Sequence, residues 1–329
     1  MFGLIWNSST GSSSSKSEDK PLPPGPGPAD SKPKPSSTPS SSSASSSASS
    51  SESTEGLEPY HTLTQSPYTE TTVTPNLNNY ANDSRGYNIK YYTVDIKLKK
   101  ISDLRTYLVT DDTGHPGDNV TDIVSNQVRT VEAGLNTNVL AAISGDSAFS
   151  YNHRPGYVIR NGQIIRDTRR NSDDATNKDA IIWKDGTMSS IWEADYTPED
   201  LIARGALQNW MFGPDLVVDS QLAVTPTSEI VSETMAQGGN QRCAIGYLGP
   251  FHFMFMVSQG RKQQNRDGFT LHDMAQILLD YGCTYAYNLD GGGSATIVAR
   301  VEDDPSPVKK YPSENTQRAL GDMIYVVDL

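Results

Sequence analysis

A long stretch near the amino terminus limits how much of this 329-residue chain can fold. Residues 11–55 are mostly Ser, Pro, Gly, Lys and Glu, and residues 40–53 are serines interrupted only by two alanines and one glutamate. Such a segment buries too little apolar surface to offset the entropy of ordering the chain, so we predict that residues 1–56 are a disordered tail or linker. Residues 57–86 are polar and aromatic without a clear period, and we treat them as a transition segment. Residues 87–329 remain, which is enough for one domain with a sizeable core.

The pattern of residues 87–329 predicts a strand-rich α+β (mixed α/β) domain with a few helices packed on the sheet. Apolar residues alternate with polar ones over residues 92–98, which is typical of a half-buried strand. Asn-Gly at 161–162 and Asp-Gly at 185–186 each predict the turn of a β-hairpin. Thr197, followed by proline and two acids, and Thr270 each predict the start of a helix. Further strands are expected over residues 104–110, 139–143, 157–166, 215–219, 243–248, 251–258 and 322–327, and a helix from about residue 123 to Gly134.

Charge and hydropathy exclude several partners and suggest a location. The formal net charge is −12 and the basic residues form no stripe, which argues against nucleic acid as a partner. No run approaches the roughly 20 apolar residues of a membrane span, and residues 1–6 are apolar for too few positions to be a signal peptide. A Ser/Pro-rich stalk is typical of domains held away from a cell surface. We therefore expect an extracellular or cell-surface protein whose export signal or anchor is missing from this sequence, and the oligomeric state stays open.

The cysteines and histidines give no framework for a disulfide or a zinc site. Cys243 and Cys283 lie in strand-like segments 40 residues apart, a spacing that does not specify a bridge, so we expect two buried, unpaired thiols. The five histidines are scattered singly. Oxygen ligands around Asp290 would suit Ca²⁺, but the spacing does not demand it. No metal or cofactor is predicted.

The most informative motif is Asn-Leu-Asp-Gly-Gly-Gly-Ser at residues 288–294, which follows an apolar run. Glycines adopt positive φ without steric cost and let a ligand approach the backbone closely. Their N–H groups could form an anion-binding concavity beside the Ser294 hydroxyl and the Asp290 carboxylate. In isolation, the motif is more typical of a tight turn between strands.

Three other predicted strands carry a single charged group at one end. Asp146 closes the first of these strands, Arg242 opens the second and Arg261 follows the third. Together with Asp290 they supply two carboxylates and two guanidinium groups, which would suit cleavage of a bond to a phosphate-bearing sugar. Arginine binds two phosphate oxygens through its planar fork, and a carboxylate stabilises or attacks an oxocarbenium-like centre. Structural salt bridges are about equally compatible with this spacing.

Six short motifs resemble those of the phosphodiester glycosidase family and occur in the same order as in that family. The resemblance covers roughly residues 88–329, and it implies hydrolysis of the glycosidic C–O bond of a sugar-1-phosphodiester in cell-surface or exopolysaccharide glycan metabolism. The substrate would be a carbohydrate phosphodiester. The matching stretches are residues 142–147, 157–162, 212–214, 242–246, 260–261 and 288–294.

The resemblance also implies roles for individual residues. Asp146, Asp290, Arg242 and Arg261 would be catalytic, the arginines neutralising the leaving phosphate and the aspartates acting as nucleophile and base. The substrate-binding residues would be Asn288, Gly291, Gly292, Gly293 and Ser294, with the Gly292 and Gly293 amides assisting at the phosphate. Which aspartate does which depends on their separation, about 5 Å for retention and about 6.5–9.5 Å for inversion. Arg318, near the last predicted strand, is a weaker candidate for the phosphate and is interpreted first as a surface arginine.

Three departures from the family pattern leave two alternatives open. Ser144 and Ser147 stand where the family has Asn and an aromatic residue, Gln259 replaces an Asp, and Cys243 replaces a Thr. One alternative is a catalytically degenerate glycan-binding module displayed on the serine-rich tether. The other is a phosphodiesterase that cleaves the P–O bond.

Overall fold

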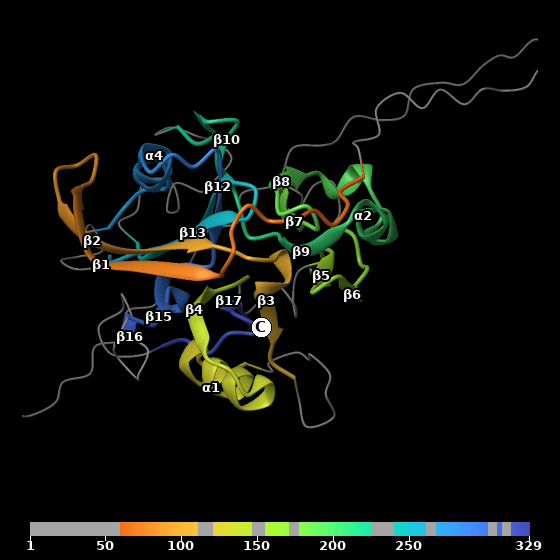
Figure 1. The fold of residues 1–329 in the computed structure, drawn as a ribbon. Coiled ribbons are helices and arrows are strands. Elements are labelled where there is room, and N and C mark those ends of the chain that lie inside the picture. Colours follow the sequence, from red (N-terminus) through yellow and green to blue (C-terminus); the bar gives the residue numbers. More distant parts are fainter. Residues whose placement is uncertain are drawn as a thin grey trace, which may run out of the picture. The chain divides into compact units, whose positions relative to one another are not determined.

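The computed structural model describes most of the chain beyond the serine-rich stretch (Figure 1). The chain divides into two units, residues 1–55 and 56–329, and all described residues belong to the second. The predicted tail therefore lies outside the described residues. The described ranges are residues 60–110, 121–146, 155–170, 178–225, 240–260, 268–301, 308–310 and 317–329.

A seven-stranded antiparallel sheet forms the larger half of the fold. Its central strands are buried on both faces, which explains the nearly continuous apolar run over residues 243–258. Along β12, Cys243 and Ile245 face one apolar cluster and Ala244 faces another. In spatial order the strands are β1 (Thr72–Asn82), β2 (Asn88–Lys97), β13 (His252–Ser258), β12 (Arg242–Gly249), β14 (Tyr285–Leu289), β10 (Asp215–Val218) and β11 (Gln221–Leu222).

A second sheet of five strands packs against one face of the first. Ile143 and Ile324 of this sheet share an apolar cluster with Ile245 and Phe255 of the seven-stranded sheet, so the main core lies between the two sheets. Its strand order is β16 (Val308–Lys310), β15 (Ile297–Ala299), β4 (Val139–Ser144), β17 (Asp322–Val327) and β3 (Leu104–Leu108).

Two helices cover the outer faces of these sheets (Figure 1). Helix α4 (Leu271–Asp280) buries Met274 and Leu278 against the seven-stranded sheet, and α1 (Val124–Leu135) buries Val128 against the five-stranded sheet. The result is a layered arrangement of helix, sheet, sheet and helix.

A smaller group of elements lies beside the two large sheets (Figure 1). It contains a three-stranded sheet, a hairpin and a third helix, whose apolar residues form a separate cluster. The elements are β8 (Met188–Ile191), β7 (Asp179–Trp183) and β9 (Ala206–Trp210), the hairpin β5 (Val158–Arg160) and β6 (Gln163–Arg166), and α2 (Pro198–Arg204). Three short 3-10 helices complete the described elements: η1 (Ile101–Asp103), η2 (Glu193–Asp195) and η3 (Gly292–Ser294).

The predicted strand-rich fold with a few helices is confirmed, including both helix caps. The Thr197 hydroxyl accepts a hydrogen bond from the Asp200 amide, and the Asp200 carboxylate accepts one from the Thr197 amide. Thr270 caps α4 in the same way. Helix α1 does not end at Gly134 as predicted but at Leu135, and Asn136 follows in the left-handed conformation (φ 50°), which asparagine tolerates. None of the helices in the described residues is long and apolar enough to cross a membrane.

The segment treated as a transition contains a strand. Thr72–Asn82 forms β1, which pairs with β2 at the edge of the seven-stranded sheet. Most of its side chains alternate between exposed and half-buried positions. An edge strand of this kind needs few apolar residues, so its hydropathy signal is weak.

Both thiols are buried and unpaired, as predicted. Cys243 belongs to the cluster between the two sheets, whereas Cys283 belongs to the cluster beneath α4. The two residues therefore lie on opposite sides of the seven-stranded sheet, which explains why they form no bridge.

Candidate active site

The glycine motif lies where the chain passes from one large sheet to the other. Strand β14 ends at Leu289 in the seven-stranded sheet, and after η3 the chain enters β15 of the five-stranded sheet. The Asp290 amide donates a hydrogen bond to the Gly145 carbonyl oxygen (3.3 Å), immediately after β4. The ends of β14 and β4 are thus adjacent, and the motifs around Asp146 and Asp290 meet here.

Close packing against the start of β12 explains the first two glycines. A Cβ atom at Gly291 would lie 2.6 Å from the Gln241 carbonyl oxygen, which no side chain could accept without a backbone shift. Gly292 has φ +60°, and its amide donates to the same carbonyl oxygen at 2.8 Å. That amide is therefore engaged within the protein and is not directed at a phosphate, in contrast to the role predicted for it.

Two side chains fix one oxygen of the Asp290 carboxylate. The Ser294 hydroxyl donates to Asp290 Oδ2 at 2.5 Å, and Arg318 Nη1 lies 3.8 Å from the same oxygen. Asp290 is 5% exposed, whereas the Arg318 side chain is 43% exposed. The Arg318 amide also donates to the Gly293 carbonyl oxygen (3.2 Å), which holds this arginine against the loop. Asp290 and Ser294 are brought together as predicted, and Arg318 joins them.

Arg242 is almost completely buried at the start of β12. Its amide donates to the Ser258 hydroxyl (3.2 Å), and its Nε donates to the Phe269 carbonyl oxygen (3.0 Å). These contacts hold the guanidinium group in place and leave it little freedom to follow a ligand. Arg261, the second predicted arginine, lies outside the described residues.

Asn288 stabilises the base of the loop. Its Nδ2 donates to the Gly213 carbonyl oxygen (2.6 Å), while Oδ1 is buried and has no hydrogen-bond partner among the described residues. An unpaired buried acceptor of this kind costs about 1–3 kcal/mol. Such exceptions call for an explanation, and a functional site is one setting in which they occur.

Asp146 occupies a different environment from Asp290. Its side chain is fully buried, and it accepts hydrogen bonds from the Met211 and Phe212 amides (3.0–3.3 Å) and from Arg160 Nη2 (3.2 Å). Burial raises the pKa of Asp146, and the adjacent Arg160 guanidinium opposes that rise. Arg160 also binds Asp322 (3.1 Å), whose carboxylate accepts the Asp146 amide. Asp146 is therefore an anchor between elements in this structure.

Two departures from the family pattern also have structural roles. The Ser144 hydroxyl donates to the Ser294 carbonyl oxygen (2.8 Å) and accepts from the Thr296 amide (3.2 Å), which fastens β4 to the glycine loop. The Gln259 side-chain amide donates to the Tyr92 hydroxyl (3.1 Å). Ser147 lies outside the described residues.

Comparison with known families identifies the domain. The sequence model of phosphodiester glycosidases matches residues 137–327, which is more than half of the chain and contains the whole Asp290 loop. The chain belongs to the phosphodiester glycosidase family. In the part of this family member that the structure describes, no group of three or more His, Cys, Asp or Glu side chains is placed to hold a metal ion.

Individual relatives are distant. The SPbeta prophage-derived uncharacterized protein YomE of Bacillus subtilis (strain 168) is 29% identical over 141 residues, which span 43% of this chain and about a fifth (21%) of YomE. The catalytic domain of zebrafish N-acetylglucosamine-1-phosphodiester α-N-acetylglucosaminidase, solved in a form auto-inhibited by its pro-peptide, has a TM-score of 0.58 at 16% identity, with 81% of this chain and 88% of that chain covered. A hypothetical protein from Synechocystis has a TM-score of 0.55 at 14% identity, with 79% and 62% covered. At these identities the solved structures show a shared fold.

Two residues around the site escaped the sequence interpretation, and a third was given too little weight. Arg160 ends a hairpin strand, Asp322 starts the last strand, and Arg318 lies in the segment that leads into it. Arg160 and Asp322 carried no local signal, because their partners are distant in sequence. Arg318 had one usable signal, since it is an isolated arginine just before a predicted strand, as Arg242 is at the head of another.

Proposed function

We propose that this domain hydrolyses the glycosidic C–O bond of a sugar-1-phosphodiester and that Asp290 is the carboxylate that acts at the sugar. Membership of the phosphodiester glycosidase family supports a glycosidase-type hydrolase. The observation that carries the proposal is the Asp290 carboxylate itself, held by the Ser294 hydroxyl at 2.5 Å with the exposed Arg318 guanidinium 3.8 Å away. A carboxylate beside an accessible cation suits a substrate that has a reacting carbon next to a phosphate.

Arg318 is the group we assign to the phosphate. Its exposed guanidinium can meet an incoming anion, whereas Arg242 is buried and its Nε is engaged by the Phe269 carbonyl oxygen. Electrostatic attraction would bring the phosphate oxygens of the substrate to the Arg318 guanidinium group. Because Arg318 Nη1 lies 3.8 Å from Asp290 Oδ2, the anomeric carbon of the bound substrate would then lie near Asp290. Arg242 then contributes a fixed positive charge at the start of β12, next to the strand end on which the glycine loop packs.

Asp146 has a positioning role in this proposal. Its carboxylate oxygens are occupied by Arg160 and by two backbone amides, so it holds β4 in place next to the loop and does not touch the sugar. A phosphate leaving group departs as a weakly basic anion and needs less protonation than a sugar alcohol. The reaction therefore does not require a carboxylic acid at the position of Asp146 to protonate the leaving group.

Turnover tests the proposal directly. Release of sugar from a panel of sugar-1-phosphodiesters is compared for the wild-type protein, Asp290→Asn, Arg318→Ala and Asp328→Asn, the last being an exposed control. We expect a loss of about 10²–10⁴-fold for Asp290→Asn and roughly 10²-fold for Arg318→Ala, with the control unchanged. Full activity in a correctly folded Asp290→Asn protein would exclude Asp290 as the reacting carboxylate.

The bond that breaks distinguishes the two classes of hydrolase. Hydrolysis in ¹⁸O-water puts the label on the sugar if the C–O bond is cleaved and on the phosphate if the P–O bond is cleaved. Saturable glycan binding without turnover on any substrate, and unchanged by Asp290→Asn, would instead identify a glycan-binding module.

We also propose a cell-surface or exopolysaccharide glycan as the source of the substrate. The support is the long Ser/Pro-rich segment that precedes the folded part. Fractionation of cells that express the full-length gene, followed by detection of this domain on intact cells, tests the location.

A further inference from the structure

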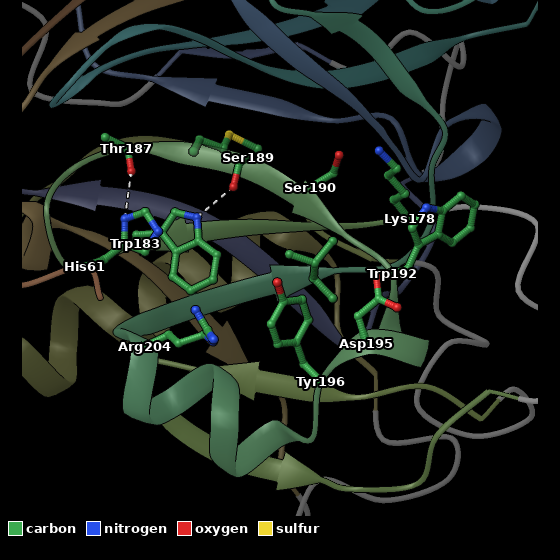
Figure 2. Close-up of a pocket in the computed structure, with 12 residues that line it drawn as sticks. His61, Lys178, Trp183, Thr187, Ser189, Ser190, Trp192, Asp195, Tyr196 and Arg204 are labelled. Carbon is green, nitrogen blue, oxygen red and sulfur yellow. Dashed lines mark hydrogen bonds between the residues drawn. The ribbon is translucent and has the colours of Figure 1, made fainter. Parts of the chain in front are cut away.

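A cavity of about 450 Å³ lies on the smaller group of elements, away from the predicted catalytic residues (Figure 2). Its walls come from β7, β8, η2, α2 and the segment around His61, and among the described residues neither Asp290, Ser294 nor Arg242 lines it. Its volume falls in the range of small-molecule sites, roughly 300–1,000 Å³. The cavity is therefore large enough for a ligand that the proposed reaction does not account for.

Aromatic rings dominate one side of this cavity. Trp192 is 41% exposed, although tryptophan is usually well buried, and the half-buried Tyr196 follows it in the same connection between β8 and α2. At the other end His61 stacks on Trp183, with ring centroids 4.2 Å apart, and closes the wall (Figure 2). Flat apolar rings with a polar edge suit the C–H face of a sugar ring.

Each of the two accessible rings has a cation beside it. Lys178 Nζ lies 5.8 Å from the centroid of Trp192, and the Arg204 guanidinium carbon lies 5.0 Å from the centroid of Tyr196. Among the described residues that line the cavity, Asp195 is the one acidic residue. Paired rings and cations favour a ligand that combines an apolar ring face with a negative charge.

Hydrogen bonds connect the wall of the cavity to the strand that leads to Asp290. The Tyr287 hydroxyl of β14 donates to the Lys178 carbonyl oxygen (2.8 Å), and the Ser190 hydroxyl donates to the Asp215 carboxylate (2.9 Å), which also accepts the Tyr285 hydroxyl (2.7 Å). These bonds reach strands β14 and β10, so the cavity is a rigid part of the domain.

We propose that this cavity binds an anionic saccharide, a pyranose ring that carries a phosphate or a carboxylate. Trp192 and Tyr196 contact the ring and Lys178 contacts the charge. Arg204 is 5% exposed and lies against the rings of both Tyr60 and Tyr196, so it supplies a fixed positive charge in the wall. The inference goes beyond the proposed function, because it concerns binding without reaction at a second place and does not depend on turnover at Asp290. Such a site would hold a charged glycan on the domain.

Protein-observed NMR titrations with three probes test this inference: glucose 6-phosphate, glucose and inorganic phosphate. We expect saturable binding of glucose 6-phosphate that is about tenfold tighter than that of either fragment. Trp192→Ala and Lys178→Met should each weaken it by about tenfold, while Asp290→Asn should bind like the wild type. Both altered side chains reach the surface, and melting curves check that the variants fold.

The matched control is a second ring and cation that do not line this cavity. Lys90 Nζ lies 5.4 Å from the ring centroid of Tyr80, which is 58% exposed on β1. Tyr80→Ala should leave binding unchanged. The proposal would be overturned if glucose 6-phosphate showed no saturable binding or bound Trp192→Ala as tightly as the wild type. It would also be overturned if inorganic phosphate bound as tightly as the sugar phosphate, or if Asp290→Asn lost binding. Loss of binding in Asp290→Asn would show that glucose 6-phosphate binds at the Asp290 site instead of in the cavity. It would leave the proposed hydrolase activity untouched, because that activity is measured separately by turnover.

Discussion

At the scale of single residues, two glycines of the Asp290 loop differ in what surrounds them. A Cβ at Gly291 would clash with the Gln241 carbonyl oxygen at 2.6 Å, whereas the nearest atoms to a Cβ at Gly293 belong to Arg318 at 3.5 Å, an ordinary contact. We expect Gly291→Ala to lower the free energy of unfolding by about 1–3 kcal/mol and to displace Asp290, while Gly293→Ala changes stability little. Urea unfolding and turnover of both variants measure this difference. Equal losses would mean that the loop is not held by its packing on β12.

The two thiols should be unreactive in the native protein. Burial raises the pKa of Cys243 and of Cys283 to about 12, so at pH 8 only about one thiol in 10⁴ would be ionised. We expect no reaction with Ellman's reagent at pH 8 in the folded state and two equivalents after unfolding in guanidinium. Rapid reaction of either thiol in the folded protein would show that its strand opens to solvent.

At the scale of elements, a single arginine joins three strands near the site. Arg160 of β5 binds Asp146, just after β4, and Asp322 at the start of β17, and all three side chains are buried. Replacing Arg160 by methionine would leave two buried carboxylates without their cation, for which we expect a loss of about 3–5 kcal/mol. Arg129→Met, on the exposed face of α1, is the control. Urea unfolding compares the two, and a loss below about 1 kcal/mol for Arg160→Met would contradict this role.

The Arg160 variant should also respond to pH in a defined direction. Burial already raises the pKa of Asp146, and removing the guanidinium removes the interaction that opposes that rise. A raised carboxyl pKa gives stability that is present at low pH and is lost as the pH rises through the folded-state pKa. The deficit of Arg160→Met relative to wild type should therefore grow from about pH 4 toward neutrality.

Local signals explain which elements could be predicted from the sequence. Strand β2 and the start of α4 were found because alternation and a threonine cap act within a few residues. Strand β9 was not, since its sequence, Ala-Leu-Gln-Asn-Trp, neither alternates regularly nor forms an apolar run. The same reason applies to the site. Asp290 was singled out as a candidate because its glycines are contiguous with it, whereas Asp322 acts on Asp146 across 176 residues and gave no such signal.

At the scale of the whole molecule, the position of the site follows from how the two large sheets meet. The Asp290 loop leaves one sheet and enters the other, and Ser144 fastens it to β4. Arg318 approaches the same loop from the segment before β17. Groups from three separate parts of the chain therefore meet at the site only in the complete two-sheet fold, and a fragment restricted to one sheet would lack it.

Truncation separates the folded unit from the segment that precedes it. Removing residues 1–55 should leave Tm within about 2 °C of the full chain, because residues 56–329 form a compact unit of their own. Removing residues 1–86 should lower Tm by roughly 5 °C or more, since it deletes β1 and also Thr71, whose hydroxyl donates to the buried Asp103 carboxylate at 2.5 Å. Differential scanning calorimetry of the three proteins decides between these expectations. A large loss from the shorter deletion would place stabilising contacts in residues 1–55, and no loss from the longer one would mean that β1 pairs with β2 without supporting the core.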